Sequence, residues 1–204
     1  MNEKQINALF ERANNFIRVG NLNAAVADYT EVLRHKPDFA PAYFNRGFAR
    51  QHGQGDVSGA IDDFSDAIRL NPDFAEAFVN RAIAHTQQND LPRALADYDT
   101  ALEQNPKLSH AYSNRGELHF LNGDLGAAAS DFRKAAEVKP GYRYAIAGLA
   151  ISLYAAGDTS EAQDLWRSLI ERNANFKDAD WVKAELGWGD DLVVEAARLI
   201  AGLG

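Results

Sequence analysis

Apolar residues recur along the chain with the three- and four-residue spacing of amphipathic helices. The clearest stretch is residues 75–108, AEAFVNRAIAHTQQNDLPRALADYDTALEQNPKL, which divides into two such patterns at Asn89-Asp90 and closes at Asn105-Pro106. We therefore predict two helices joined by a short turn. The pattern repeats along the chain in steps of 34 residues, with one step of 35 where HGQGDVSG contains an additional residue. A fixed period of this length is typical of stacked helical repeats.

Several places recur in every copy, and each has a steric reason. Small residues at the eighth place let the two helices of a pair approach closely, and they are Ala13, Gly47, Ala82, Gly116 and Ala150. The twentieth place serves the same purpose with Ala25, Ala60, Ala94, Ala128 and Ala162. The aromatic residues at the twenty-fourth place fill the space between neighbouring pairs, and they are Tyr29, Phe64, Tyr98, Phe132 and Trp166. Proline ends the second helix at Pro37, Pro72, Pro106 and Pro140.

The turn inside each pair is expected to need a residue with positive φ. The residues at that place are Gly20, Gly55, Asn89, Gly123 and Gly157. Asparagine is the substitute expected there, because its short side chain tolerates the left-handed conformation.

This period and these residues resemble the tetratricopeptide repeat family over residues 6–176. The resemblance implies an all-α fold, a right-handed superhelical solenoid of helix-turn-helix repeats. We expect five repeats, at residues 6–39, 40–74, 75–108, 109–142 and 143–176. The fourth place, usually Trp or Tyr in the family, is a looser match here, with Leu9, Tyr43, Phe78, Tyr112 and Ile146.

The C-terminal part departs from the pattern. Residues 144–157 are apolar on all sides, so they should be covered on all sides. Helices are expected at 178–186 and 190–203, and we interpret residues 177–204 as a capping pair packed on the same domain, because a terminal repeat needs a cover. The alternative is self-assembly, in which the apolar fifth repeat faces another copy together with Trp188, Leu192, Val193 and Leu199.

Composition narrows the class of partner. The formal net charge of −8 argues against nucleic-acid binding. The chain has no cysteine, so neither disulfides nor thiolate metal sites are expected. No secretory signal is visible, and the longest uncharged run, residues 144–157, is too short for a membrane span. We expect a cytoplasmic protein without membrane insertion.

Charged residues recur in pairs at the seventh and twenty-third places. The arginines are Arg12, Arg46, Arg81 and Arg115, and the acids are Asp28, Asp63, Asp97 and Asp131. The fifth copy replaces both charges, with Leu149 and Leu165. Because both places change together, we predict that each arginine pairs with the aspartate of its own repeat, in a structural ion pair.

The resemblance implies a concave surface lined by the first helix of each repeat, where a peptide segment or helix of a partner would bind. The expected groove residues are Asn14, Phe44, Asn45, Phe48, Val79, Asn80, Ile83, Asn114, Glu117, Tyr144 and Ile151. Asn45, Asn80 and Asn114 share the sixth place of three successive repeats. Each carboxamide has a donor and an acceptor, so this series suits either peptide recognition or bonding between helices, and the sequence leaves both open.

Some family members bind the C-terminal carboxylate of a chaperone through a set of two lysines, two asparagines and an arginine. Here Asn14 and Asn45 match the asparagines of that set, but Phe10, Glu76 and Asn80 stand where its lysines and arginine are needed. We therefore expect no chaperone carboxylate clamp. With Glu11, Glu76 and Glu117 near the groove against Arg18, a neutral or basic peptide is the better partner.

No nucleophile elbow, zinc-binding HExxH sequence or phosphate-binding loop occurs in the chain. His85 and His119 share the eleventh place of adjacent repeats, and packed histidines are expected there in preference to a metal site. The sequence therefore predicts a non-catalytic adaptor or scaffold with no cofactor, no metal site and no catalytic residue, with a homo-oligomer as the alternative.

Overall fold

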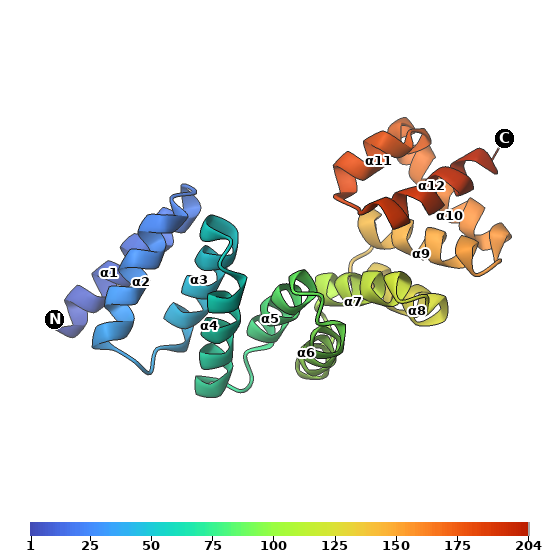
Figure 1. Cartoon of the computed structure of the whole chain (residues 1–204). Coiled ribbons are helices and arrows are strands. Elements are labelled where there is room, and N and C mark those ends of the chain that lie inside the picture. The colour runs from blue at the N-terminus through green and yellow to red at the C-terminus, as the bar shows by residue number, and fades with distance from the viewer. Residues whose placement is uncertain (204) are drawn as a thin grey trace. The chain divides into compact units, whose positions relative to one another are not determined.

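The computed structural model describes residues 1–203, and all its regular elements are helices (Figure 1). The α-helices are α1 (Glu3–Arg18), α2 (Leu22–His35), α3 (Ala40–Ala49), α4 (Val57–Leu70), α5 (Ala75–Gln87), α6 (Leu91–Gln104), α7 (Ser109–Leu121), α8 (Leu125–Val138), α9 (Arg143–Ala155), α10 (Thr159–Arg172), α11 (Ala179–Leu186) and α12 (Asp190–Ala201). A π-helix, η1 (Arg50–Gln54), follows α3, and a 3-10 helix, η2 (Ala174–Lys177), follows α10. The all-α helical-repeat prediction is confirmed.

The chain forms two compact units, which we call unit 1 (from Met1 to Asn105) and unit 2 (from Pro106 onward). Unit 1 contains the helix pairs α1–α2, α3–α4 and α5–α6. Unit 2 contains α7–α8 and α9–α10, followed by α11 and α12. The C-terminal helices thus belong to the same compact unit as the apolar α9, while the division into five repeats and a cap stays a prediction.

Each helix pair turns at a residue in the left-handed conformation. The φ angles at the predicted places are 76° at Gly20, 65° at Gly55, 59° at Asn89, 80° at Gly123 and 94° at Gly157. Asn89 is the only non-glycine residue with positive φ among residues 1–203. The next residue caps the second helix through its side chain, as Asp90 does for the backbone N–H of Arg93 at 3.3 Å. The predicted turn chemistry is confirmed.

The additional residue of the second repeat is accommodated by the π-helix η1. Each turn of a π-helix holds more residues than an α-helical turn, so one residue can be inserted without unwinding α3. The η1 segment packs against α2. A Cβ atom on Gly53 would lie 2.4 Å from Cβ of Leu22, so this contact requires glycine.

The aromatic and small places pack as predicted within unit 1. Tyr29 and Phe64 are fully buried, each among alanines of neighbouring helices. A Cβ atom on Gly47 would lie 2.9 Å from Cε1 of Phe64, so the small eighth place lets α3 and α4 approach closely.

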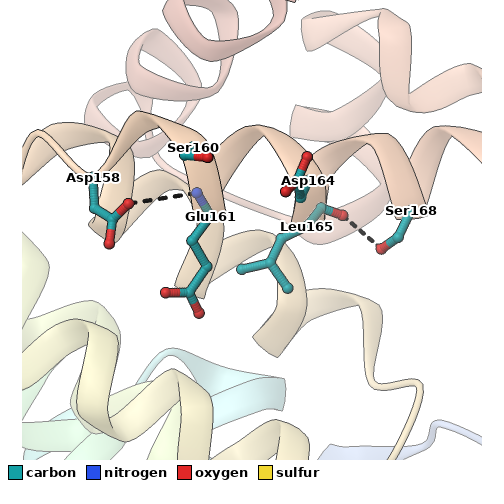
Figure 2. Close-up of a pocket in the computed structure, with 6 residues that line it drawn as sticks. All are labelled: Asp158, Ser160, Glu161, Asp164, Leu165 and Ser168. Atoms are coloured by element: carbon teal, nitrogen blue, oxygen red, sulfur yellow. Dashed lines mark hydrogen bonds between the residues drawn. The ribbon is translucent and has the colours of Figure 1, made fainter.

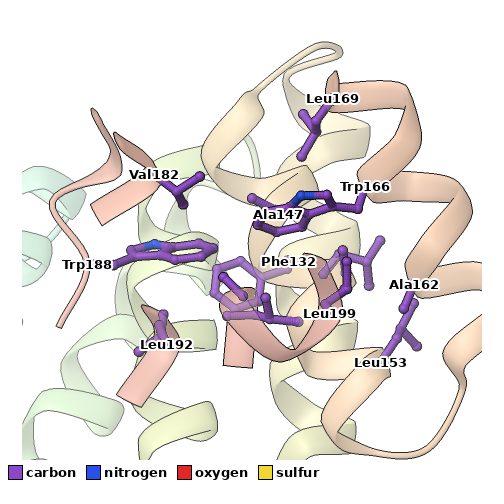
Figure 3. Close-up of a cluster of buried hydrophobic side chains, with 14 of the residues drawn as sticks. Phe132, Ala147, Leu153, Ala162, Trp166, Leu169, Val182, Trp188, Leu192 and Leu199 are labelled. Carbon is purple, nitrogen blue, oxygen red and sulfur yellow. The ribbon is translucent and has the colours of Figure 1, made fainter. Parts of the chain in front are cut away.

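The core of unit 2 surrounds α9. Figure 3 shows Phe132, Trp166, Trp188, Leu192 and Leu199 gathered in one buried cluster. Trp166 also donates its indole N–H to the carbonyl oxygen of Phe176 at 2.9 Å, and this bond joins α10 to η2. Because α8, α10 and α12 all contact α9, its apolar surface is covered within the unit.

The predicted arginine–aspartate pairs are confirmed. In every one the guanidinium donates two hydrogen bonds to the carboxylate of the same repeat, at 2.6–2.9 Å. Asp63 receives a further ion pair from Arg50 at 3.0 Å. All four aspartates are buried, so each guanidinium offsets the desolvation of a carboxylate. In the fifth copy Leu149 is buried and Leu165 packs against the same core.

Within residues 1–203 no helix is long and apolar enough to cross a membrane. The same part of the chain contains no group of three or more His, Cys, Asp or Glu side chains that could hold a metal ion.

Candidate functional site

A small pocket in unit 1 brings together three of the predicted groove residues. It has a volume of about 150 Å³, and its lining residues are Asn14, Ile17, Tyr29, Asn45 and Phe48. These side chains come from α1, α2 and α3. Their placement follows from the repeat, because the first helices of two successive pairs and the intervening second helix meet at this point. We call this site the amide pocket.

The polar side chains of the amide pocket form a hydrogen-bonded network. The Tyr29 hydroxyl donates to Oδ1 of Asn14 at 2.6 Å. Nδ2 of Asn45 donates to the same oxygen at 3.1 Å. Asn14 Oδ1 is therefore fully used, since a carbonyl oxygen has two acceptor positions. The network fixes both carboxamides in orientation.

The surroundings of Tyr29 in the amide pocket shift its titration. Burial raises the pKa of Tyr29 to about 12, a hydrogen bond with Asn45 opposes the shift, and the carboxylates of Glu11 and Asp28 add to it. Tyr29 therefore remains a neutral hydroxyl donor at physiological pH. The lining residues include no lysine or arginine.

An aromatic contact lies beside the pocket. The ring of the exposed His52, in η1, packs at a tilt against Phe48, with centroids 4.4 Å apart and an interplanar angle of 46°. His52, Ile17 and Tyr29 were not among the predicted site residues. The available signals were the additional residue in the second repeat and the position of Tyr29, which places its hydroxyl beside Asn14.

The other groove residues predicted in unit 1 lie outside the amide pocket. Phe44 packs against Phe74 and Phe64, with ring centroids 4.8 and 5.8 Å away. Ile83 is half-buried. Val79 is only 1% exposed, so its assignment to a ligand-contacting surface was wrong. Its side chain is covered where α5 packs in the repeat stack.

Asn80 serves its own helix. Its Nδ2 donates to the carbonyl oxygen of Glu76, one turn earlier, at 2.8 Å. Among the three asparagines of the sixth place, only Asn45 lines the amide pocket. Asn114, in α7 of unit 2, is half-buried. The series is thus uneven in its bonding, because Asn45 donates to a second carboxamide and Asn80 donates to its own helix.

Two predicted residues of unit 2 contact each other. The Tyr144 hydroxyl donates to Oε2 of Glu117. Burial raises the pKa of the Glu117 carboxyl, and the hydrogen bond from Tyr144 partly opposes this shift. Burial and the neighbouring carboxylate both raise the pKa of Tyr144. Tyr144 also meets the edge of Trp188, with centroids 5.8 Å apart, so the pair is joined to the C-terminal helices.

Ile151 was also wrongly assigned to the groove. Its side chain is 0% exposed and belongs to the core cluster of unit 2. The ninth-place residues of the other repeats are half-buried, whereas in the fifth repeat α9 is also contacted by α12.

The two histidines at the eleventh place are packed, as predicted. His85 is buried, and its Nε2 lies 4.0 Å from a carboxylate oxygen of Asp97. The corresponding distance from His119 to Asp131 is 3.9 Å. Burial lowers the pKa of His85. Both rings therefore pack beside a structural ion pair.

A second concave region in unit 2 was not predicted. Its volume is about 500 Å³. Figure 2 shows the residues that line it along α10, which are Asp158, Ser160, Glu161, Asp164, Leu165 and Ser168. Asp158 caps the helix by accepting a hydrogen bond from the Glu161 backbone N–H at 3.4 Å. Three acids at three-residue spacing, Asp158, Glu161 and Asp164, were the available signal. Two of its three acids are already paired with arginines, Glu161 with Arg133 at 2.7 Å and Asp164 with Arg167 at 3.1 Å.

Comparisons with known proteins agree on the fold. Family models described as tetratricopeptide repeat match residues 53–109, 82–143 and 119–186. Together they span residues 53–186, more than half of the 204-residue chain. A search of curated proteins found no match.

Solved structures similar to this chain include a tetratricopeptide repeat protein from Parabacteroides merdae, with 24% identity and a TM-score of 0.77, covering 98% of this chain and 75% of that one. YrrB, described as a TPR protein with an unusual peptide-binding site, has 20% identity and a TM-score of 0.70, with coverage of 93% and 90%. The first TPR of Spaghetti (RPAP3), bound to the HSP90 peptide SRMEEVD, has 25% identity and a TM-score of 0.55, with coverage of 58% and 93%. At these identities the likeness concerns the fold.

Proposed function

Since this chain belongs to the tetratricopeptide repeat family, we propose that it is a non-catalytic protein-interaction scaffold that binds a peptide segment or helix of a partner in a groove lined by the first helices of its repeats. The observation that carries the proposal is the amide pocket. It combines oriented carboxamides with apolar walls from Ile17 and Phe48. A binding site usually combines apolar walls with a small number of polar groups that fix the orientation of the ligand.

The proposed partner segment is neutral or basic. No cation lines the amide pocket, and the carboxylate of Glu11 contributes to the raised pKa of Tyr29. A neutral or positively charged segment therefore meets a complementary potential, which favours encounter and selectivity.

A chaperone carboxylate clamp is not proposed. Phe10 stands at one of the places where a clamp needs a cation, and its ring packs against Phe39 and Tyr29 with centroids 4.9 and 5.7 Å apart. Asn80 stands at another such place and is bonded to its own helix. RPAP3 is solved with the HSP90 peptide SRMEEVD, but the acidic end of such a peptide would find no cation at these places.

Self-assembly is not favoured by the residues that suggested it. Trp188, Leu192 and Leu199 are buried in the core of unit 2, and α9 is covered by its neighbours. Val193 is half-buried and packs against the same core. The apolar surface is thus used inside the unit, so we retain peptide binding as the proposed function.

A capture experiment with matched variants tests this function. The wild-type chain, an Asn14→Ala/Asn45→Ala double variant and an Asn80→Ala control would each be immobilised and exposed to lysate of the source cells. Circular dichroism would first verify that all three are folded, because Asn14→Ala removes the acceptor of a buried tyrosine hydroxyl. Overlapping peptides of each captured protein would then be tested for direct binding.

We expect a protein that is held by the wild type and the Asn80→Ala control and is lost by the double variant. One of its uncharged or basic segments should bind directly. If every captured protein binds the double variant as well as the wild type, the amide pocket is not the binding site and the proposal is wrong.

A further inference from the structure

We propose that the amide pocket recognises an uncharged primary carboxamide, the side chain of a glutamine or asparagine in the partner. This inference rests on the proposed function and names the chemical group that the groove selects. It follows from the hydrogen-bonding capacity that the pocket leaves unused, from its size and from the absence of cations.

One donor group and one acceptor remain available. Asn14 Oδ1 accepts from both Tyr29 and Asn45, so Asn14 retains its Nδ2 hydrogens for a ligand. Asn45 uses Nδ2 in that network and retains Oδ1. Both residues are half-buried and line the pocket. The pocket thus presents a donor and an acceptor from neighbouring residues.

A primary carboxamide complements both the free donor and the free acceptor, because it carries an oxygen and an amino group on the same carbon atom. Its carbonyl oxygen accepts from Asn14 Nδ2, and its amino group donates to Asn45 Oδ1. A trans peptide unit carries its C=O and N–H on opposite sides, so it cannot direct both toward the same pair of side chains. The geometry therefore favours a side-chain carboxamide over the partner's backbone.

A charged side chain satisfies either the Asn14 donor or the Asn45 acceptor, but not both. An ionised carboxylate has no donor, so it would leave Asn45 Oδ1 facing another acceptor without any cation to neutralise it. An ammonium group has no acceptor for the hydrogens of Asn14. Glutamate and glutamine have nearly the same shape, so the pocket should prefer glutamine through hydrogen bonding alone. Sites built to hydrogen-bond a polar group of the ligand discriminate in this way.

The size of the pocket fits one side chain. Its volume of about 150 Å³ is below the roughly 300–1,000 Å³ of small-molecule sites, and a cavity of about this size accommodates a benzene-sized group. The methylene groups of glutamine would lie against the walls formed by Ile17 and Phe48, while its carboxamide meets the asparagines.

Side-chain amide NMR signals provide the test, because each asparagine reports directly. The full chain, labelled with ¹⁵N, would be titrated at neutral pH with N-acetyl-glutamine-N-methylamide and with the glutamate and leucine analogues. We expect saturable shifts of the Asn14 and Asn45 amino signals with the glutamine probe, at least about tenfold tighter than with either analogue. The Asn80 signals should not move, since its amino group is held by Glu76.

An Asn45→Ala variant should lose the response to the glutamine probe, and an Asn80→Ala variant should keep it. Equal responses to the glutamine and leucine probes would mean recognition of the peptide backbone, which overturns the carboxamide inference and leaves the proposed function standing. Equal responses to glutamine and glutamate, or no shift with any probe, would also overturn it. The proposed function itself fails only if the captured partner binds the Asn14→Ala/Asn45→Ala variant as tightly as it binds the wild type.

Discussion

At the scale of single residues, the same kinds of polar side chain have different roles according to what they contact. The four repeated aspartates are buried and receive two hydrogen bonds from an arginine, so their charge is fully used inside the fold. Asn14 and Asn45 are also bonded to each other, yet each keeps one free group. Unused hydrogen-bonding capacity, more than residue type, separates a candidate site from a structural contact.

The Arg81–Asp97 pair gives a direct test of the structural role. Arg81→Leu should destabilise unit 1 by about 3 kcal/mol, because Asp97 would remain buried without its partner. Arg81→Leu combined with Asp97→Leu should cost less, since the fifth repeat already has leucine at both places. Urea denaturation followed by circular dichroism measures both. Losses that simply add would show that the two residues act independently.

Glu117 predicts a pH dependence of stability. Burial raises the pKa of its carboxyl in the folded state, so the folded chain holds a proton that the unfolded chain releases. The stability that the protonated Glu117 contributes is fully present at pH values below the pKa of its carboxyl in the unfolded chain, about 4.3. It is lost as the pH rises through the higher pKa of the folded chain. Glu117→Gln keeps an acceptor for Tyr144 and removes this loss.

The melting temperature of Glu117→Gln should therefore exceed that of the wild type at neutral pH, and the difference should vanish near pH 4. Thermal melts from pH 4 to 8 would follow the difference, with the exposed Glu103→Gln as the control. A constant offset across this range would mean that Glu117 does not titrate in the folded chain.

At the scale of elements, the turn inside each helix pair is the most regular feature. A residue with positive φ is followed by an asparagine or aspartate that caps the next helix, as in Gly123-Asp124. The two residues together stop one helix and start the next. Asn89 is the exception in residue type and has the same conformation, with φ of 59°.

Substitutions at Asn89 should distinguish backbone conformation from side-chain contact. Asn89→Ala should destabilise the α5–α6 pair by about 1 kcal/mol, because a Cβ-bearing residue without a compensating polar group is disfavoured in the left-handed region. Asn89→Gly should be neutral or slightly stabilising. Chemical denaturation of both variants provides the comparison. Equal losses for alanine and glycine would mean that the asparagine side chain itself is required.

The elements were largely predictable because they depend on local spacing. The period of 34, the turn residues and the paired charges all place contacts between residues of one repeat or of neighbouring repeats. The additional residue of the second repeat was visible, but its accommodation in the π-helix η1 was not, because that depends on packing against α2.

The candidate site was predicted less completely, since exposure depends on which element covers a residue. Ile151 and Val79 occupy places that the repeat pattern assigns to the groove, yet both are buried by neighbouring helices. Asn80 has the same place as Asn45 but bonds to its own backbone. A repeated place fixes the direction of a side chain, whereas its partners depend on the neighbouring repeat.

At the scale of the whole molecule, the C-terminal helices complete the core of unit 2. Trp188 lies between α11 and α12 and is buried with Leu192 and Phe132 in the cluster of Figure 3. Contacts of this kind bury α9 and prevent an exposed apolar face. The consequence is that stability in unit 2 depends on residues outside the five predicted repeats.

Trp188→Ala should therefore destabilise unit 2 by about 3–5 kcal/mol through the lost burial and the resulting cavity. Hydrogen–deuterium exchange with mass spectrometry would resolve the effect by segment. Amides of α9 and α12 should exchange faster, while those of α1 and α2, in the other compact unit, should keep their protection. A uniform increase along the whole chain would show that the two units unfold together.

The central claim, that the chain binds a partner segment through Asn14 and Asn45, is tested most directly by the affinity of the captured segment. Isothermal titration would compare the wild type, the Asn14→Ala/Asn45→Ala variant and the Asn80→Ala control. We predict a loss of at least about tenfold for the double variant, corresponding to the removed hydrogen bonds, and unchanged affinity for the control. Equal affinities of the wild type and the double variant would contradict the account.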